Sequence, residues 1–188
     1  MSAGSMDDQM QRMLRRIIRD VQVELGEEFH KNFERQAFFS RPWQRRKSPL
    51  RPGGAILVDS GELRRDLKSQ AGDNKVTFYS HHPAAAIHNE GGEIVVTEKM
   101  RKFFWHKYYE AQGSLGRKKN GEYRRNKYNL RLTTEAVFWR NMALMKVGSK
   151  IKMPRRQFVG NASEVDKAVS DIIDKNMKKF FNNDCKLQ

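Results

Sequence analysis

Cysteine is nearly missing from this chain: Cys185 is the single one among 188 residues. One thiol cannot form an intrachain disulfide, which fits folding in a reducing compartment. Long apolar runs are missing too, and no stretch approaches the roughly 20 residues that span a bilayer. The first residues also lack the apolar segment of a signal peptide. We therefore expect a soluble protein, made in the cytoplasm, that does not bind membranes.

Acidic side chains are scarce relative to basic ones, with 22 Asp and Glu against 37 Lys and Arg, for a formal net charge of +15. Such an excess predicts attraction to nucleic acid, to an anionic membrane or to an acidic protein, without choosing among them. Hydrophobic residues make up 38% of the chain, so it is a polar globular chain and not a disordered one.

The length suits one domain over residues 1–188. We expect residues 1–6 to be disordered or to derive from cloning, because Met6 is a plausible native start.

Hydrophobic periodicity places a long helix near each end of the chain. Apolar residues recur at three- and four-residue steps over 7–36 and again over 163–181. Asp59 followed three residues later by Glu62 has the spacing of a capping box, so a short helix is expected over 60–69.

Strands are expected in between, at 75–80, 93–97 and 150–154. The segment 98–148 reads as a basic helical insertion, with helices at 98–112 and 133–148 joined by a mobile loop or hairpin. The fold class is therefore α+β: a small, mainly antiparallel sheet of three or four strands, packed by long N- and C-terminal helices.

The stretch YSHHPAAAIHNEGGEI, residues 79–94, concentrates the residues with chemical potential. The candidate metal ligands are His81, His82, His88 and Glu90, and the three histidines could also form the centre of a metal-dependent nuclease. Adjacent histidines in a strand point to opposite faces, however, and no remote ligand pair completes a set. We expect a structural corner here, with no metal ion, no cofactor, no catalytic residues and no enzymatic activity.

A second candidate is the basic, aromatic-containing region 99–131. Lysine and arginine beside aromatic rings can hold phosphates and stack on bases. Alternatively, the aromatic rings pack the two helices together while the charges stay solvated. The candidate contacts to nucleic acid or to an acidic partner are Lys102, Arg117, Lys118, Lys119, Arg124, Arg125 and Lys127.

Three segments in fixed order carry a resemblance: ILVDSGELRRDL at 56–67, YSHHPAAAIHNEGGEI at 79–94 and KIKMPRRQFVGNASEVD at 150–166. Together they resemble the virion-morphogenesis (tail-completion) proteins of Mu-like and other long-tailed phages. The positions that match the family pattern are Ser60, Gly61, Leu63, Ala86, His88, Gly91, Gly92, Pro154, Arg156, Phe158 and Gly160.

The resemblance implies a structural protein for tail completion or head–tail joining in a phage or prophage. It would act by self-association, as a homo-oligomer such as a ring, and by contact with other tail or head–tail connector proteins. It would be made in the host cytoplasm and end in the virion. The alternative is a non-sequence-specific nucleic-acid-binding protein that uses the basic region, and charge contact with DNA is compatible with both.

Overall fold

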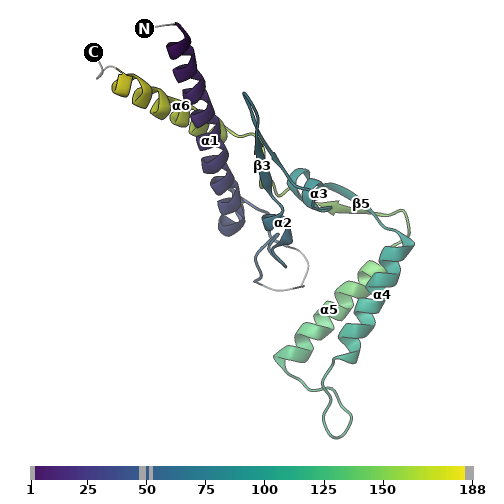
Figure 1. Cartoon of the computed structure of the whole chain (residues 1–188). Coiled ribbons are helices and arrows are strands. Elements are labelled where there is room, and N and C mark those ends of the chain that lie inside the picture. The colour runs from purple at the N-terminus through teal and green to yellow at the C-terminus, as the bar shows by residue number, and fades with distance from the viewer. Residues whose placement is uncertain (1–2, 47–49, 51–52, 185–188) are drawn as a thin grey trace. The chain divides into compact units, whose positions relative to one another are not determined.

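The computed structural model describes residues 3–46, 50 and 53–184 (Figure 1). The chain divides into two compact units, each described by itself. Unit 1 comprises Met1–Trp43, Ala55–Glu90 and Arg155–Gln188, and unit 2 comprises Gln44–Gly54 and Gly91–Pro154.

Two long helices frame unit 1, as the periodicity predicted. Helix α1 (Ala3–Arg35) and helix α6 (Ser163–Asp184) cross each other and diverge toward their outer ends (Figure 1). The side chain of Asn176 donates to Asp20 at 2.9 Å across the crossing. Helix α1 starts four residues earlier than expected, so Ala3–Met6 form its first turn; residues 1 and 2 lie outside the described part of the chain.

The core of unit 1 is built on aromatic side chains of α1. Phe29 and Phe33, one turn apart, are 2% and 1% exposed. The ring of Phe29 lies edge-on to Phe78 at 4.9 Å, and that of Phe33 lies 5.1 Å from Phe158. Each such ring contributes about 1.5–3 kcal/mol through burial, so α1 is held by segments far from it in sequence.

Three two-stranded antiparallel pairs take the place of the expected three- or four-stranded sheet. Strand β1 (Ala37–Phe38) pairs with β2 (Arg41–Pro42), and β3 (Lys68–Ala71) pairs with β4 (Val76–Tyr79). In unit 2, β5 (Gly92–Val95) pairs with β6 (Lys150–Met153). The α+β class and three of the strands, β4, β5 and β6, are confirmed.

The helix expected over 60–69 is shorter than predicted. Helix α2 spans only Glu62–Arg65, with Gly61 and not Asp59 at its N-cap position. Residues 68–71 instead form strand β3, because their backbone pairs with β4 in the register Lys68 to Tyr79. Tertiary pairing here overrides a local sequence that is compatible with helix.

Unit 2 consists of the β5–β6 pair and a helical hairpin. Helix α4 (Glu98–Gly113) packs along α5 (Lys127–Ala143), with the ring of Phe104 stacked on Trp139 at 5.7 Å. Helix α5 starts six residues before the expected position because the Asn126 side chain caps it, accepting from the Asn129 N–H at 2.8 Å. Among the described residues, no helix has the length and low charge needed to cross a bilayer.

The remaining element is a short helix in unit 1. Helix α3 covers Ala85–Glu90, within the histidine-containing stretch, and Pro83 lies just before it. It carries the candidate residue His88.

Candidate functional site

The second and third sequence motifs meet in unit 1 through backbone groups. The His88 carbonyl accepts a hydrogen bond from the Arg156 N–H at 2.7 Å. One residue on, the Asn89 side-chain oxygen accepts from the N–H groups of Phe158 and Val159, at 3.0 and 3.2 Å. Arg156 is 6% exposed and Phe158 1% exposed. The end of α3 therefore fixes the path of the chain as it re-enters unit 1.

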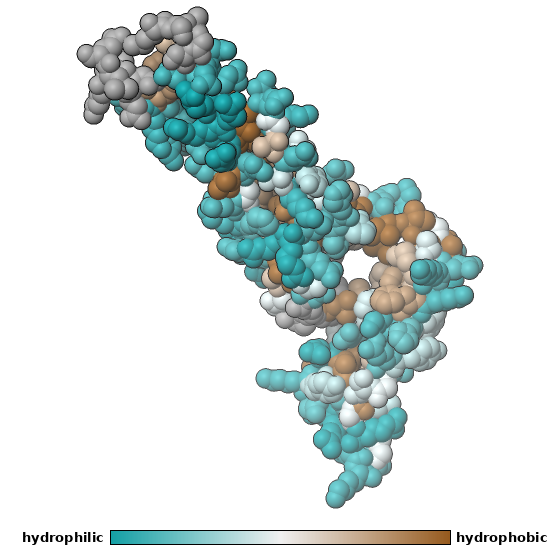
Figure 2. Space-filling model, viewed as in Figure 1, coloured by the Kyte–Doolittle hydropathy of each residue, from teal (hydrophilic) through white to brown (hydrophobic). Residues whose placement is uncertain are grey.

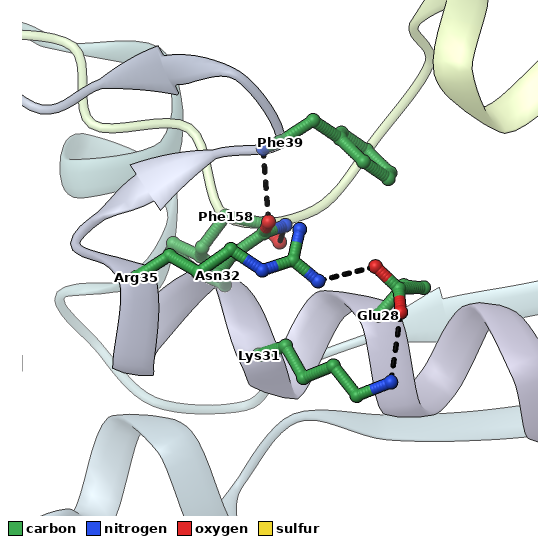
Figure 3. A network of polar contacts seen from close by, with 6 residues as sticks. All are labelled: Glu28, Lys31, Asn32, Arg35, Phe39 and Phe158. Atoms are coloured by element: carbon green, nitrogen blue, oxygen red, sulfur yellow. Dashed lines mark hydrogen bonds and ion pairs between the residues drawn. The ribbon is translucent and has the colours of Figure 1, made fainter.

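Asn32 of α1 also binds this segment, at Phe158 (Figure 3). This side chain is fully buried; its nitrogen donates to the Phe158 carbonyl at 3.1 Å, and its oxygen accepts from the Phe39 N–H at 2.9 Å. On the exposed side of α1, Glu28 pairs with Lys31 at 2.8 Å and with Arg35. Asn32 was not among the residues singled out from the sequence, because nothing local distinguishes a buried asparagine.

The first motif contributes to the same core through one side chain. Leu63 of α2 is 6% exposed and belongs to the hydrophobic cluster that contains Phe158. Ser60 accepts a hydrogen bond from the Glu62 N–H at 3.3 Å, and Gly61 has φ of 76°. A left-handed conformation favours glycine, since a Cβ would be strained there.

The corner at the end of α3 has the backbone that the glycine pair predicted. Gly91 and Gly92 have φ of 75° and 138°, values that residues with a side chain rarely adopt. Gly160 has φ of 126°, and a Cβ on it would lie 3.1 Å from the Gln157 side chain. Pro154 directly follows strand β6. These residues fix the path of the backbone.

The backbone N–H groups of the adjacent histidines are bound by Asp66, which directly follows α2. Its carboxylate accepts from the Ser80 hydroxyl and from the N–H groups of His81 and His82, at 2.6, 2.6 and 2.7 Å. The hydrogen bond from Ser80, followed by those backbone N–H groups, holds the pKa of Asp66 below its ordinary value. Within the described ranges, no three His, Cys, Asp or Glu residues are grouped so that they could hold a metal ion.

The candidate cations of the basic region lie on the hairpin of unit 2, and all seven are exposed. Lys102 is on α4 and Lys127 begins α5. The other five lie on the connection between the helices, where Arg117 bridges to Tyr123 in a small β-like turn. There the Arg117 guanidinium lies 4.5 Å from the centre of the Tyr123 ring.

Asn129 gives this connection a defined shape. It is 5% exposed; its side chain donates to the carbonyls of Gly116 and Arg124 at 2.7 and 2.8 Å, and accepts from the Gly116 N–H at 2.9 Å. The sequence was compatible with either a mobile loop or a hairpin for this segment. The structure shows a hairpin, held by three hydrogen bonds of one buried side-chain amide. The sequence gives no local sign of this role.

The aromatic rings of the hairpin are engaged with one another. Trp139 contacts Phe103 and Phe104 at 5.9 and 5.7 Å between ring centres. Trp105 stacks with Tyr109 at 5.9 Å. Packing between the helices therefore accounts for Phe103, Phe104 and Trp139, whereas Trp105 and Tyr109 stack within α4 and Tyr109 is 64% exposed.

Comparison with known families assigns the chain. A model of the phage virion morphogenesis family matches residues 4–178, a range that includes most of both long helices, all three motifs and the hairpin. No curated protein and no solved structure matches at a significant level. A match over nearly the whole length is decisive: the chain belongs to the phage virion morphogenesis family.

Proposed function

We propose that this protein completes the phage tail or joins the tail to the head, as a self-associating structural protein that catalyses no reaction. The observation that carries the proposal is the family match, which gives the chain a role in phage virion assembly. Its partners are further copies of itself and other tail or head–tail connector proteins. It is made in the host cytoplasm and ends at the tail or the head–tail junction.

Apolar side chains left exposed in unit 1 support self-association. On the N-terminal half of α1, Met6, Met10 and Leu14 follow one another at four-residue steps and are 57%, 47% and 37% exposed. On the C-terminal half of α6, Phe181 is 55% exposed. Residues at this spacing share one helix face, and such faces mark contact surfaces when they form a continuous patch.

The strand pairs support it as well. Because every sheet in the described part of the chain has two strands, every strand there is an edge with unpaired backbone groups. In unit 2, Val95 of β5 is 51% exposed, and Figure 2 shows a group of hydrophobic residues over this strand pair. An isolated pair of strands is only marginally stable, so a neighbouring copy that covers β5–β6 would add stability.

A closed ring is the form of self-association we favour. A ring requires two different faces on each protomer, one meeting the other on its neighbour. The α1–α6 surface and the β5–β6 pair are two such faces of different composition.

The test is the absolute mass in solution, measured by light scattering over a concentration series at low and high salt. We expect a discrete oligomer that survives high salt, because apolar contacts are not screened. Met10→Glu puts a charge on the exposed apolar face and should reduce the mass to that of a smaller species. Gln11→Glu adds the same charge at the next, exposed polar position and should leave the mass unchanged.

Two results would contradict the proposal. One is a monomer under all conditions, also when the other tail and head–tail proteins of the same phage are added. The other is hydrolysis of nucleic acid by the purified protein that His88→Ala abolishes while the circular dichroism spectrum is retained.

A further inference from the structure

Nearly all of the net charge of this protein is in unit 2. That unit contains 19 Lys and Arg against 5 Asp and Glu, a net of +14, whereas unit 1 contains 18 against 17, a net of +1. The two units have similar numbers of cations, so the difference lies in the shortage of carboxylates in unit 2. A unit with such an excess creates a strong local positive potential.

Within the hairpin, the few carboxylates are already paired. Residues 99–131 hold eleven Lys and Arg but only Glu110 and Glu122 as carboxylates. Glu110 pairs with Lys107 at 2.7 Å, and Glu122 pairs with Lys118 at 3.0 Å. The exposed cations of this segment that pair with no carboxylate in the described part of the chain are Lys99, Lys102, Arg117, Lys119, Arg124, Arg125, Lys127 and Arg131.

Several of these cations are mounted on ordered backbone. Lys127 and Arg131 are one helical turn apart on α5, and Arg125 directly precedes the Asn126 cap. The connection that carries Lys119 is held by Asn129 and by the Arg117–Tyr123 contact. An ordered array loses less conformational entropy on binding a polyanion than a flexible tail does.

We propose that this basic hairpin, residues 99–131, binds the phosphate backbone of duplex DNA without sequence preference. Duplex DNA carries one negative charge per roughly 1.7 Å of its axis, so a row of cations can release many counterions at once. The rings of Phe104 and Trp139 stack on each other between α4 and α5 and are not open to bases, which favours contact with the phosphate backbone.

The surface supports the same assignment. Figure 2 shows hydrophilic residues over most of the hairpin in that view. The proposal goes beyond a role in virion assembly, since a protein can assemble through the α1–α6 surface and the β5–β6 pair whether or not the hairpin contacts DNA. A failure of one proposal is therefore distinguishable from a failure of the other.

The experiment is fluorescence anisotropy of the full-length protein with two 30-base-pair duplexes of unrelated sequence, from 50 to 300 mM NaCl. We expect equal affinity for both sequences and a steep loss of affinity with salt. The variant with Lys119, Arg125, Lys127 and Arg131 changed to Gln should bind at least tenfold more weakly at 100 mM. Its plot of log K against log salt should be shallower by about 3 to 4, at about 0.9 per lost phosphate contact.

The matched control changes four exposed cations of unit 1 to Gln: Arg15, Arg16, Arg19 and Lys179. It has the same net charge as the hairpin variant and should keep the wild-type affinity and salt slope. Circular dichroism and light scattering on both variants check that fold and mass are unchanged.

Four outcomes would overturn the proposal. They are no duplex binding at 50 mM NaCl, an equal loss of affinity in the control, tighter binding of single-stranded than of duplex DNA, and competition by polyglutamate as effective per charge as by DNA. The last result would make an acidic protein the partner of this hairpin.

Discussion

Asn32 joins α1 to two distant segments of unit 1, and Asn32→Ala removes both links. The change leaves the Phe158 carbonyl and the Phe39 N–H without their partners at 3.1 and 2.9 Å. A buried group left unsatisfied costs about 1–3 kcal/mol. The cost at the Phe158 carbonyl should lie near the upper end of that range, because Phe158 is 1% exposed. The cost at the Phe39 N–H should lie near the lower end, because Phe39 is only half-buried. We expect a loss of about 2–4 kcal/mol in the free energy of unfolding.

Urea denaturation followed by circular dichroism and by tryptophan fluorescence measures this loss. Trp43 reports on the same region, because it is 7% exposed and its ring lies 5.7 Å from Phe33. Asn161→Ala is the control: this asparagine is exposed, and its replacement should change stability by less than about 0.5 kcal/mol. A loss below about 1 kcal/mol for Asn32→Ala, or an equal loss in the control, would refute the role assigned to Asn32.

Two further predictions concern the histidine-containing stretch and the corner that follows it. The folded-state pKa of Asp66 lies below its ordinary value, so the contribution of this carboxylate to stability is present above that ordinary value and is lost as pH falls through the folded pKa. The difference in unfolding free energy between wild type and Asp66→Asn, measured by urea denaturation, should therefore shrink between neutral and acidic pH. A difference that stays constant with pH would contradict this. Gly91→Ala should lower the free energy of unfolding by about 1–2 kcal/mol because φ is 75° there. Gly113→Ala, at the end of α4 with open space around it, should be neutral or stabilising. Equal effects of the two substitutions on the melting temperature would count against the backbone argument.

The long helices could be predicted because their evidence is local and repeated. Each of α1 and α6 buries apolar residues at three- and four-residue steps over many turns, so one misleading position does not change the assignment. Leu25, Phe29 and Phe33 lie on the face that the periodicity identified, and all three are buried.

The strand pairs were harder because their evidence is not local. Residues 68–71, KSQA, have no alternating pattern, and only their pairing with β4 makes them a strand. Strands β1 and β2 have two residues each, too few for any periodicity to show.

The residues that hold the candidate sites were the least visible. Asn32 donates a hydrogen bond to Phe158, 126 positions away, and a single sequence does not show that two residues so far apart are in contact. The motifs are recognisable by their order along the chain, but the contacts that join the second motif to the third are not. These contacts are hydrogen bonds from the Arg156 N–H to the His88 carbonyl and from the Phe158 N–H to the Asn89 side chain. The number of cations in the hairpin was plain from the sequence, but which remained unpaired depended on the structure.

The β5–β6 pair has one more consequence, for how proteins of this architecture can diversify. Val95 lies opposite Lys150 in the ladder, so the chain leaves and returns at neighbouring points around the segment 96–149. A segment whose two ends are adjacent can be lengthened, exchanged or replaced by a tight turn without changing the gap that the flanking chain must close. The sequence of the helical hairpin can therefore change independently of the core, and chains with a common core can differ in what their hairpins bind.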